Sequence, residues 1–191
     1  MDLVKRNEIL GLGDYEAIRS HFRTRVIEEK KRRRFPVGPS ATVVFENHDT
    51  VLLQIQEMLR TERITKESAI QHEIDVYNQL VPKKGEVSCT LMFEISDKEE
   101  RETFLVRAKD VEKNMFLVVN GERQPVQWDV AREIPDRTSA VHYLKIPLTD
   151  EAVAAIKSGD ATVEFQIGHA AYRHTALLPH EVLASLVEDL L

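Results

Sequence analysis

The chain has 191 residues, of which 42% are hydrophobic and 30% are charged, and its formal net charge is −6. This composition is typical of a globular protein and excludes a disordered or collagen-like chain. No apolar run approaches the roughly 20 residues that a membrane-spanning helix needs, and the start of the chain lacks the apolar segment of a signal peptide. We therefore expect a single cytoplasmic domain over residues 1–191, with no membrane insertion.

Helical periodicity and capping signals predict the elements of the first half. After an arm over residues 1–13, a helix runs from Asp14, a good N-cap, to about Arg33. The proline-containing segment 35–39 ends it. We expect a strand over 41–45, a turn over 46–49 and a returning strand over 50–53. Two helical stretches follow, one from about residue 54 and one over 66–79.

Strands dominate the second half. Strict alternation predicts a strand over 87–95, and a capping box then opens a helix that ends near Lys109. Residues 115–119 and 123–128 flank Asn120-Gly121 and predict a hairpin with a type I′ turn. Further strands are expected over 138–148, 161–167 and 172–178, with a helix between Thr149 and Gly159 and a C-terminal helix over 180–191.

The order of these elements favours an α+β fold. We expect a mostly antiparallel sheet of about six to eight strands, with four to six helices packed around it. The single cysteine, Cys89, lies on the apolar face of its predicted strand, so we interpret it as a small buried side chain rather than a reactive thiol. One cysteine cannot form an internal disulfide, which suits a reducing cytoplasm. It also cannot hold an iron–sulfur cluster, so we expect no such cluster in this chain.

Motifs of the common enzyme classes are absent from the sequence. There is no glycine-rich phosphate loop, no G-x-S-x-G elbow, no H-E-x-x-H and no paired C-x-x-C. Three histidines are more informative, because His142, His169 and His174 fall on the apolar faces of predicted strands. If those strands are neighbours the imidazoles converge, and neutral imidazole is the commonest metal-binding side chain.

Two carboxylates complete this candidate site. Glu62 and Glu73 fall on the apolar stripes of their predicted helices. A buried carboxylate must be paired, protonated or bound to a cation. Together with the three histidines, they would form a histidine–carboxylate site for iron, manganese or zinc. The alternative is that each residue is an ordinary core polar group with its own hydrogen-bond partner.

The charge is unevenly distributed. Residues 19–34 contain eight Lys or Arg against two Glu, a net charge of +6, which leaves −12 for the rest of the chain. A run of five cations ends this segment: Lys30, Lys31, Arg32, Arg33 and Arg34. Few aromatic residues accompany the run, so nucleic-acid binding is disfavoured. We interpret it as a docking surface for an acidic partner protein; the alternative is a solvated helix end whose cations oppose the helix dipole.

The segments QIQEMLRTERI (54–64), TSAVH (138–142) and HAAYRH (169–174) resemble those of a bacterial family catalogued as a domain of unknown function (thirty-five-oh-one). The resemblance runs from the first helix to about Leu178. Genes of this family often lie beside those for rubrerythrin-like proteins and for iron–sulfur oxidoreductases resembling a heterodisulfide reductase subunit. The resemblance therefore implies a redox setting, and it assigns no catalytic residue. The chain departs from the family pattern at His72 and Ala170, where the family has an acidic residue and a proline.

Three functional hypotheses follow. The first is an accessory or adaptor protein for an iron–sulfur oxidoreductase or a rubrerythrin-like redox system. The second is a small metalloenzyme that uses the histidine–carboxylate cluster, and the third and least favoured is a nucleic-acid-binding regulator. Each is compatible with a homodimer.

Overall fold

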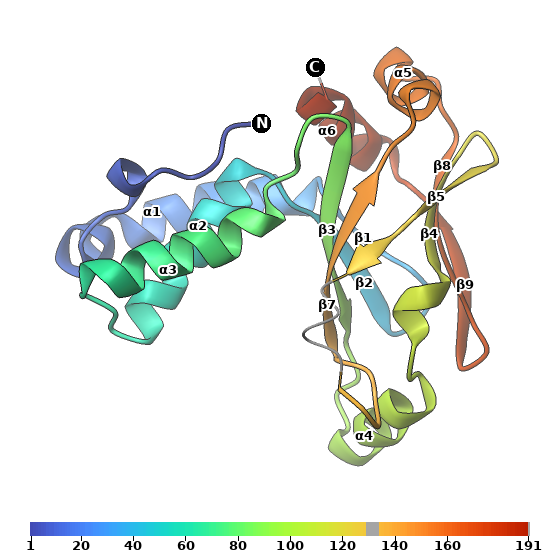
Figure 1. Ribbon diagram of the computed structural model, residues 1–191, viewed down its shortest axis with the longest axis horizontal. Helices are drawn as coiled ribbons and strands as arrows, with labels where there is room; N and C mark the ends of the chain where they lie inside the picture. Colours follow the sequence, from blue (N-terminus) through green and yellow to red (C-terminus); the bar gives the residue numbers. More distant parts are fainter. Residues whose placement is uncertain (129–133, 191) are drawn as a thin grey trace.

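The computed structural model describes residues 1–128 and 134–190, and its centre is a sandwich of two antiparallel sheets (Figure 1). The first sheet has the strand order β1-β2-β3-β7-β6. Its strands are β1 (Arg34–Pro36), β2 (Ala41–Phe45), β3 (Glu86–Phe93), β6 (Gln127–Trp128) and β7 (Val141–Pro147). The second sheet has the order β5-β4-β8-β9. It consists of β4 (Met115–Val119), β5 (Glu122–Pro125), β8 (Val163–His169) and β9 (Tyr172–Leu177).

The main hydrophobic core lies between the inner faces of the two sheets. Burial alternates along β7, so that His142, Leu144 and Ile146 are buried, as the period of two in a strand requires. Leu144 pairs across the ladder with Cys89 of β3. Phe165 enters the same cluster from β8 of the opposite sheet. Removal of these apolar side chains from water, worth about 25 cal/mol per Å², holds the sheets together.

Three helices lie at the ends of the sandwich (Figure 1). One end carries α4 (Lys98–Arg107), and the other carries α5 (Asp150–Ser158) and α6 (His180–Leu190). The side chain of Thr149 accepts a hydrogen bond from the backbone N–H of Ala152 at the start of α5, and Gly159 ends the helix with a φ of 79°. The prediction of this helix from its caps is confirmed.

The first three helices form a unit that projects from one side of the sandwich (Figure 1). Helix α1 (Leu12–Lys31) packs on α2 (His48–Thr61), which packs on α3 (Glu67–Tyr77). These helices share a second hydrophobic cluster with the N-terminal arm, whose Val4 and Ile9 are buried in it. The short 3-10 helices are η1 (Arg6–Glu8) in that arm, η2 (Asn78–Leu80) after α3, and η3 (Val111–Asn114) before β4.

The predicted α+β class with antiparallel pairing is confirmed. The described residues form nine strands in two sheets, whereas one sheet of six to eight was expected. The short strand β1 lies in the proline-containing segment, and β5 and β6 divide the predicted strand 123–128 between the two sheets. The hairpin is confirmed, because Asn120 and Gly121 both have positive φ, 49° and 88°, as a type I′ turn requires.

The predicted turn over 46–49 and strand over 50–53 are wrong, since α2 begins at His48. Asn47 is its N-cap: its side chain accepts a hydrogen bond from the backbone N–H of Thr50, and the Thr50 hydroxyl accepts one from the backbone N–H of Asn47. This reciprocal cap starts the helix despite the strand propensity of Thr50 and Val51. In the described ranges, no helix combines the length and the apolar character that crossing a membrane requires.

Candidate functional site

The residues predicted to share a metal site lie in separate parts of the molecule. Glu62 is an exposed residue directly after α2, and Glu73 is a half-buried residue of α3, so both belong to the projecting helical unit. His142 lies in β7 of the first sheet. His169 and His174 lie in β8 and β9 of the second sheet. The structure thus distributes the five side chains over three parts of the fold.

Each histidine also has its own local contacts. The ring of Phe93 packs edge-on against His142, with centroids 5.8 Å apart, while Tyr172 contacts His174 at 4.5 Å. Nδ1 of His169 accepts a hydrogen bond from the backbone N–H of Ala171. Within residues 1–128 and 134–190, no three His, Cys, Asp or Glu side chains are placed to hold one metal ion. The predicted convergence of the five residues is therefore not found, and binding of iron, manganese or zinc stays a prediction.

The basic run has a structural role that the sequence did not indicate. The side chain of Arg33 is 2% exposed. Its guanidinium donates to both carboxylate oxygens of Asp189, at 2.6 and 2.9 Å, and its Nε donates to Glu29 at 2.6 Å. Asp189 belongs to α6, so Arg33 connects the C-terminal helix to the end of α1. At 2% exposure Arg33 offers almost no surface to a partner, and docking at the basic run as a whole stays a prediction.

The other cations of the run lie at the surface and are mostly paired within the chain. Arg32 donates to Glu188 of α6 at 2.5 Å and to Glu29 at 2.8 Å. Lys31 bonds to Glu28, and Arg34 bonds to Glu94. Lys30 makes no ion pair with a described residue. Most of the charge that suggested a docking surface is thus neutralised inside the molecule.

Cys89 is 1% exposed. Burial, with a smaller contribution from the Glu46 carboxylate, raises the pKa of its thiol. The side chain is therefore protonated at neutral pH and inaccessible to reagents, which agrees with its interpretation from the sequence.

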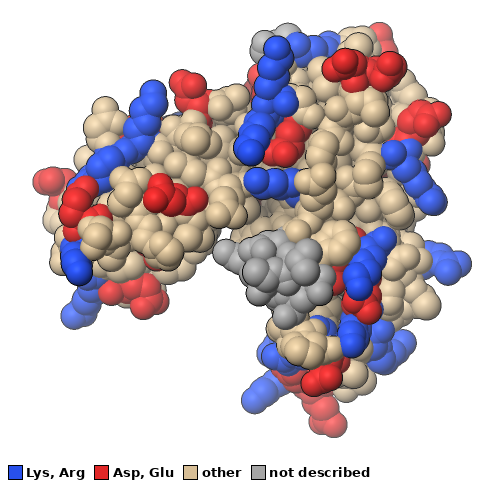
Figure 2. Space-filling view, in the orientation of Figure 1, with Lys and Arg blue, Asp and Glu red and all other residues tan. Residues whose placement is uncertain are grey.

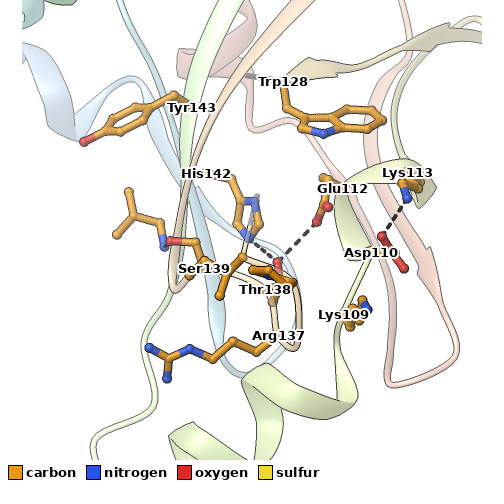
Figure 3. A pocket seen from close by; sticks show the side chains of 13 residues that line it. Lys109, Asp110, Glu112, Lys113, Trp128, Arg137, Thr138, Ser139, His142 and Tyr143 are labelled. Carbon is orange, nitrogen blue, oxygen red and sulfur yellow. Dashed lines mark hydrogen bonds and ion pairs between the residues drawn. The ribbon is translucent and has the colours of Figure 1, made fainter. Parts of the chain in front are cut away.

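A pocket of about 700 Å³ opens beside His142, between η3 and the start of β7 (Figure 3). This volume is in the range of small-molecule sites. Trp128 contributes an aromatic wall, and Lys109 and Arg137 contribute positive charge, whereas the ring of Tyr143 lies on the other face of β7 from His142 (Figure 3). In Figure 3 the ring of Trp128 lies above the space between His142 and the residues of η3.

Three buried polar side chains, Glu112, Thr138 and His142, lie together in this pocket, and we call them the polar floor. Oγ1 of Thr138 is 3.2 Å from Oε2 of Glu112 and 3.2 Å from Nε2 of His142. The hydroxyl has one proton, and a charged acceptor binds it about twice as strongly as a neutral one. Thr138 therefore donates to Glu112 and accepts from the Nε2–H of His142. In this arrangement His142 does not activate Thr138 as a nucleophile.

The polar floor holds a neutral imidazole beside a carboxylate. Burial lowers the pKa of His142, and this outweighs the Glu112 charge and a backbone hydrogen bond at Ser139, which both raise it. The imidazole is therefore neutral at pH 7. A ligand that stabilises the charged form can add a proton to it.

A second pocket, of about 240 Å³, lies between the projecting helical unit and the first sheet. Tyr77 and Leu80 line it from one side and Lys145 lines it from the other, and Trp128 and Tyr143 line both pockets. We call the two pockets together the β7 groove. Figure 2 shows the hollow between the helical unit and the sandwich on this face.

The β7 groove carries more positive than negative charge, although the whole chain has a net charge of −6. Its described charged residues are Lys109, Lys113, Arg137, Lys145, Asp110 and Glu112. Lys113 pairs with Asp110 at 2.6 Å, and Arg137 pairs with Glu102. Lys109 and Lys145 make no ion pair with any residue that the structure describes. These two lysines are available to an acidic ligand.

Sequence reasoning identified His142 and missed its partners. Glu112 lies in a connection after α4, where no periodicity marks a buried side chain. Trp128 lies at the end of the two-residue strand β6. The one available signal was the TSAVH segment, in which a hydroxyl and an imidazole stand four residues apart, as the bond between Thr138 and His142 reflects.

Comparison with known proteins agrees with the resemblance found in the sequence. Residues 3–190 match the family described as "Protein of unknown function (DUF3501)". A crystal structure of a novel protein of unknown function from Burkholderia pseudomallei has a TM-score of 0.92 and 34% identity, and the match covers 99% of this chain and 100% of that chain. No curated protein matches this chain. Since sequence and fold agree over nearly the whole length, the chain belongs to the DUF3501 family.

Proposed function

We propose that this protein is an accessory protein that binds an acidic segment of a redox partner in the β7 groove. The observation that carries the proposal is the position of Trp128 and Tyr143 between Lys109 and Lys145. Tryptophan and tyrosine are enriched where proteins bind one another, because they provide a large apolar contact with a polar end. Lysines beside them accelerate the encounter with an acidic partner.

The class of the partner rests on the resemblance rather than on geometry. The gene neighbours implied for the family are iron–sulfur oxidoreductases and rubrerythrin-like proteins. An accessory role suits a chain whose one thiol is buried at 1% exposure. The redox chemistry would then reside in the partner.

The groove is a better docking surface than the basic run from which docking was first predicted. Arg33 is buried, and Arg32 is held by Glu188 and Glu29. A partner would have to displace these intramolecular bonds before it could use either cation. Lys109 and Lys145 have no such bonds to described residues, so they can attract a partner without that cost.

Calorimetric titration with a purified iron–sulfur oxidoreductase of the heterodisulfide-reductase type tests the proposal. We expect the double reversal Lys109→Glu and Lys145→Glu to weaken binding by about tenfold or more. Binding of the unchanged protein should also weaken as salt rises. Lys30→Glu is the matched control, since Lys30 belongs to the basic run and makes no ion pair with a described residue, and its reversal should leave the affinity unchanged.

Two results would contradict the proposal. One is an affinity that the double reversal in the groove leaves unchanged. The other is a loss of affinity on Lys30→Glu alone, which would return docking to the basic run.

A further inference from the structure

We propose that the pocket over the polar floor is a binding site for a carboxylate group. This inference rests on the proposed function, because the carboxylate is the one that the acidic segment of the partner presents at the deep end of the β7 groove. The pocket is the part of the groove where the ring of Trp128, a lysine without an ion pair to any described residue, and a buried imidazole meet (Figure 3).

The distribution of charge in the pocket favours an anion. The two described carboxylates that line it are already engaged: Asp110 by Lys113 at 2.6 Å, and Glu112 by the hydroxyl of Thr138. Lys109, in the turn between α4 and η3, has no such partner among the described residues. An incoming carboxylate therefore meets Lys109 and the imidazole of His142, while Arg137, which also lines the pocket, is paired with Glu102.

The polar floor can supply one more positive charge to such a ligand. A carboxylate close to His142 favours the imidazolium over the neutral imidazole. The bonds from His142 to Thr138 and from Thr138 to Glu112 remain in place on protonation, and Glu112 then stabilises the added charge. One proton from solution is taken up with each ligand and forms an N–H bond at the free ring nitrogen of His142; no covalent bond forms between the ligand and the protein.

The charge of His142 depends on all charged groups of the described residues that line the pocket. Lys109, Asp110, Glu112 and Lys113 face it from the turn after α4 and from η3, and Arg137 faces it from the loop before β7. Phe93 of β3 packs on the other side of the imidazole and carries no charge. Among the described residues of the pocket, Glu112 is therefore the carboxylate that is hydrogen-bonded to Thr138 in the floor.

The walls indicate what the carboxylate is attached to. Trp128, Ile134 and Pro135 present apolar and aromatic surface around the floor. Flat apolar groups bind such walls well. A suitable probe is therefore benzoate, which carries a carboxylate on a flat apolar ring. Benzamide has nearly the same shape without the charge, and it is the matched control.

Trp128 is the single tryptophan of the chain, so its fluorescence reports on the pocket directly. At about pH 6, near the ordinary pKa of histidine, benzoate is expected to change this fluorescence. Benzamide should bind at least about tenfold more weakly, because it lacks the charge that Lys109 and His142 recognise. The affinity for benzoate should fall as pH rises, by at most about tenfold per pH unit, as one linked proton allows. Calorimetry in two buffers of different ionisation enthalpy measures the uptake of that proton.

Two variants separate recognition from proton uptake. Lys109→Met, an exposed substitution, should weaken benzoate binding about fivefold or more. His142→Gln should abolish the proton uptake and the pH dependence. If His142→Gln does not fold, the Lys109→Met variant and the benzamide control still decide the question.

Equal binding of benzamide and benzoate, or binding of benzoate without proton uptake, would overturn the inference. These outcomes differ from a failure of the proposed function. If benzoate does not bind but Lys109→Glu and Lys145→Glu still weaken partner binding, the docking proposal is supported and the carboxylate site is contradicted. If benzoate binds with proton uptake but both reversals leave the affinity for the partner unchanged, the carboxylate site is supported and the docking proposal is contradicted.

Discussion

Gly38 lies where the loop between β1 and β2 meets the edge of the second sheet. Its φ is 75°, and a Cβ atom there would lie 2.5 Å from Cγ of His174 and 2.7 Å from the hydroxyl of Tyr172. That hydroxyl donates to the carbonyl of Val37 at 2.7 Å and accepts from the N–H of Ser40 at 3.0 Å. The loop is thus tied to β9, and the position requires glycine for its conformation and for its lack of a side chain.

We predict that Gly38→Ala lowers the free energy of unfolding by about 2 kcal/mol or more, through backbone strain and through displacement of His174 and Tyr172. Gly159→Ala is the control. Gly159 has a similar φ of 79° but no atom within 4 Å of its added Cβ, so it should cost about 1 kcal/mol from strain alone. Urea denaturation measures both, and equal losses would show that the close contact at Gly38 is unimportant.

For single residues, the sequence predicted well whether a side chain faces the interior, but it did not predict which residues that side chain contacts. The period of two in β7 correctly placed His142 inside. Its partner Glu112 comes from η3, 30 residues earlier by their numbers. Such a contact depends on how two segments distant in the sequence pack together, and no local sequence pattern predicts it. Glu62 shows the opposite error, because the apolar stripe suggested burial and the helix ends one residue before it.

Among the elements, α6 depends on an ionic contact as well as on apolar packing. Its side chains Val182 and Leu186 are buried in the main hydrophobic core of the sandwich. Asp189 and Glu188 fasten its end to Arg33 and Arg32. Hydrogen bonds from Arg33 oppose the burial that raises the pKa of Asp189. A buried arginine of this kind needs its carboxylate, since an uncompensated charge in the interior is costly.

We predict that Asp189→Asn destabilises the protein by about 3 kcal/mol, because Arg33 then keeps Glu29 as its only carboxylate partner among the described residues. The control is Lys31→Ala, which removes an exposed pair with Glu28 and should change stability by less than about 0.5 kcal/mol. Chemical denaturation compares the two. A loss for Asp189→Asn no greater than for the control would mean that the buried pair contributes nothing to the position of α6.

Elements with local signals at both ends were predictable, and those fixed by distant contacts were not. Helix α5 has a threonine cap and a left-handed glycine, and the hairpin has Asn-Gly, so each carries its own boundary. The start of α2 depends on Asn47, whose sequence context also suits a turn. The basic run suggested a partner as a string of charges, but the sequence did not reveal its carboxylates within the chain. Two of these five carboxylates, Glu188 and Asp189, come from α6 and lie 156 positions from the arginines that they bind.

For the molecule as a whole, the proposed docking surface forms only when segments distant in the sequence pack together. The β7 groove takes residues from α3, η2, η3, β6 and β7, which are scattered over the sequence and come together only when the helical unit lies beside the first sheet. Its positive charge opposes the net charge of −6, so neither composition nor any single segment could predict it. The fold class was predictable because alternation and capping are local; the groove was not.

The stability of the whole fold should depend on pH in two separate windows. Burial lowers the pKa of His142 from its ordinary 6.5. Just below that pH the unfolded chain therefore binds a proton at His142 more readily than the folded chain does. Stability from this residue is present above pH 6.5 and is lost as pH falls toward the folded pKa. Hydrogen bonding from Arg19, above all, lowers the pKa of Glu57 from 4.5 to about 2. Its contribution is complete above pH 4.5 and is lost between there and pH 2.

Urea denaturation between about pH 7.5 and pH 5.5 isolates the first window. We expect the free energy of unfolding to fall with pH in the unchanged protein, and to fall less in His142→Gln, which has no imidazole to protonate. Saturating benzoate should reduce the fall in the unchanged protein, since a ligand that binds the protonated folded state returns the proton to it. The variant should show no such rescue. A His142→Gln profile as steep as that of the unchanged protein would mean that other histidines cause the acid sensitivity, and the link between the polar floor and the stability of the fold would be lost.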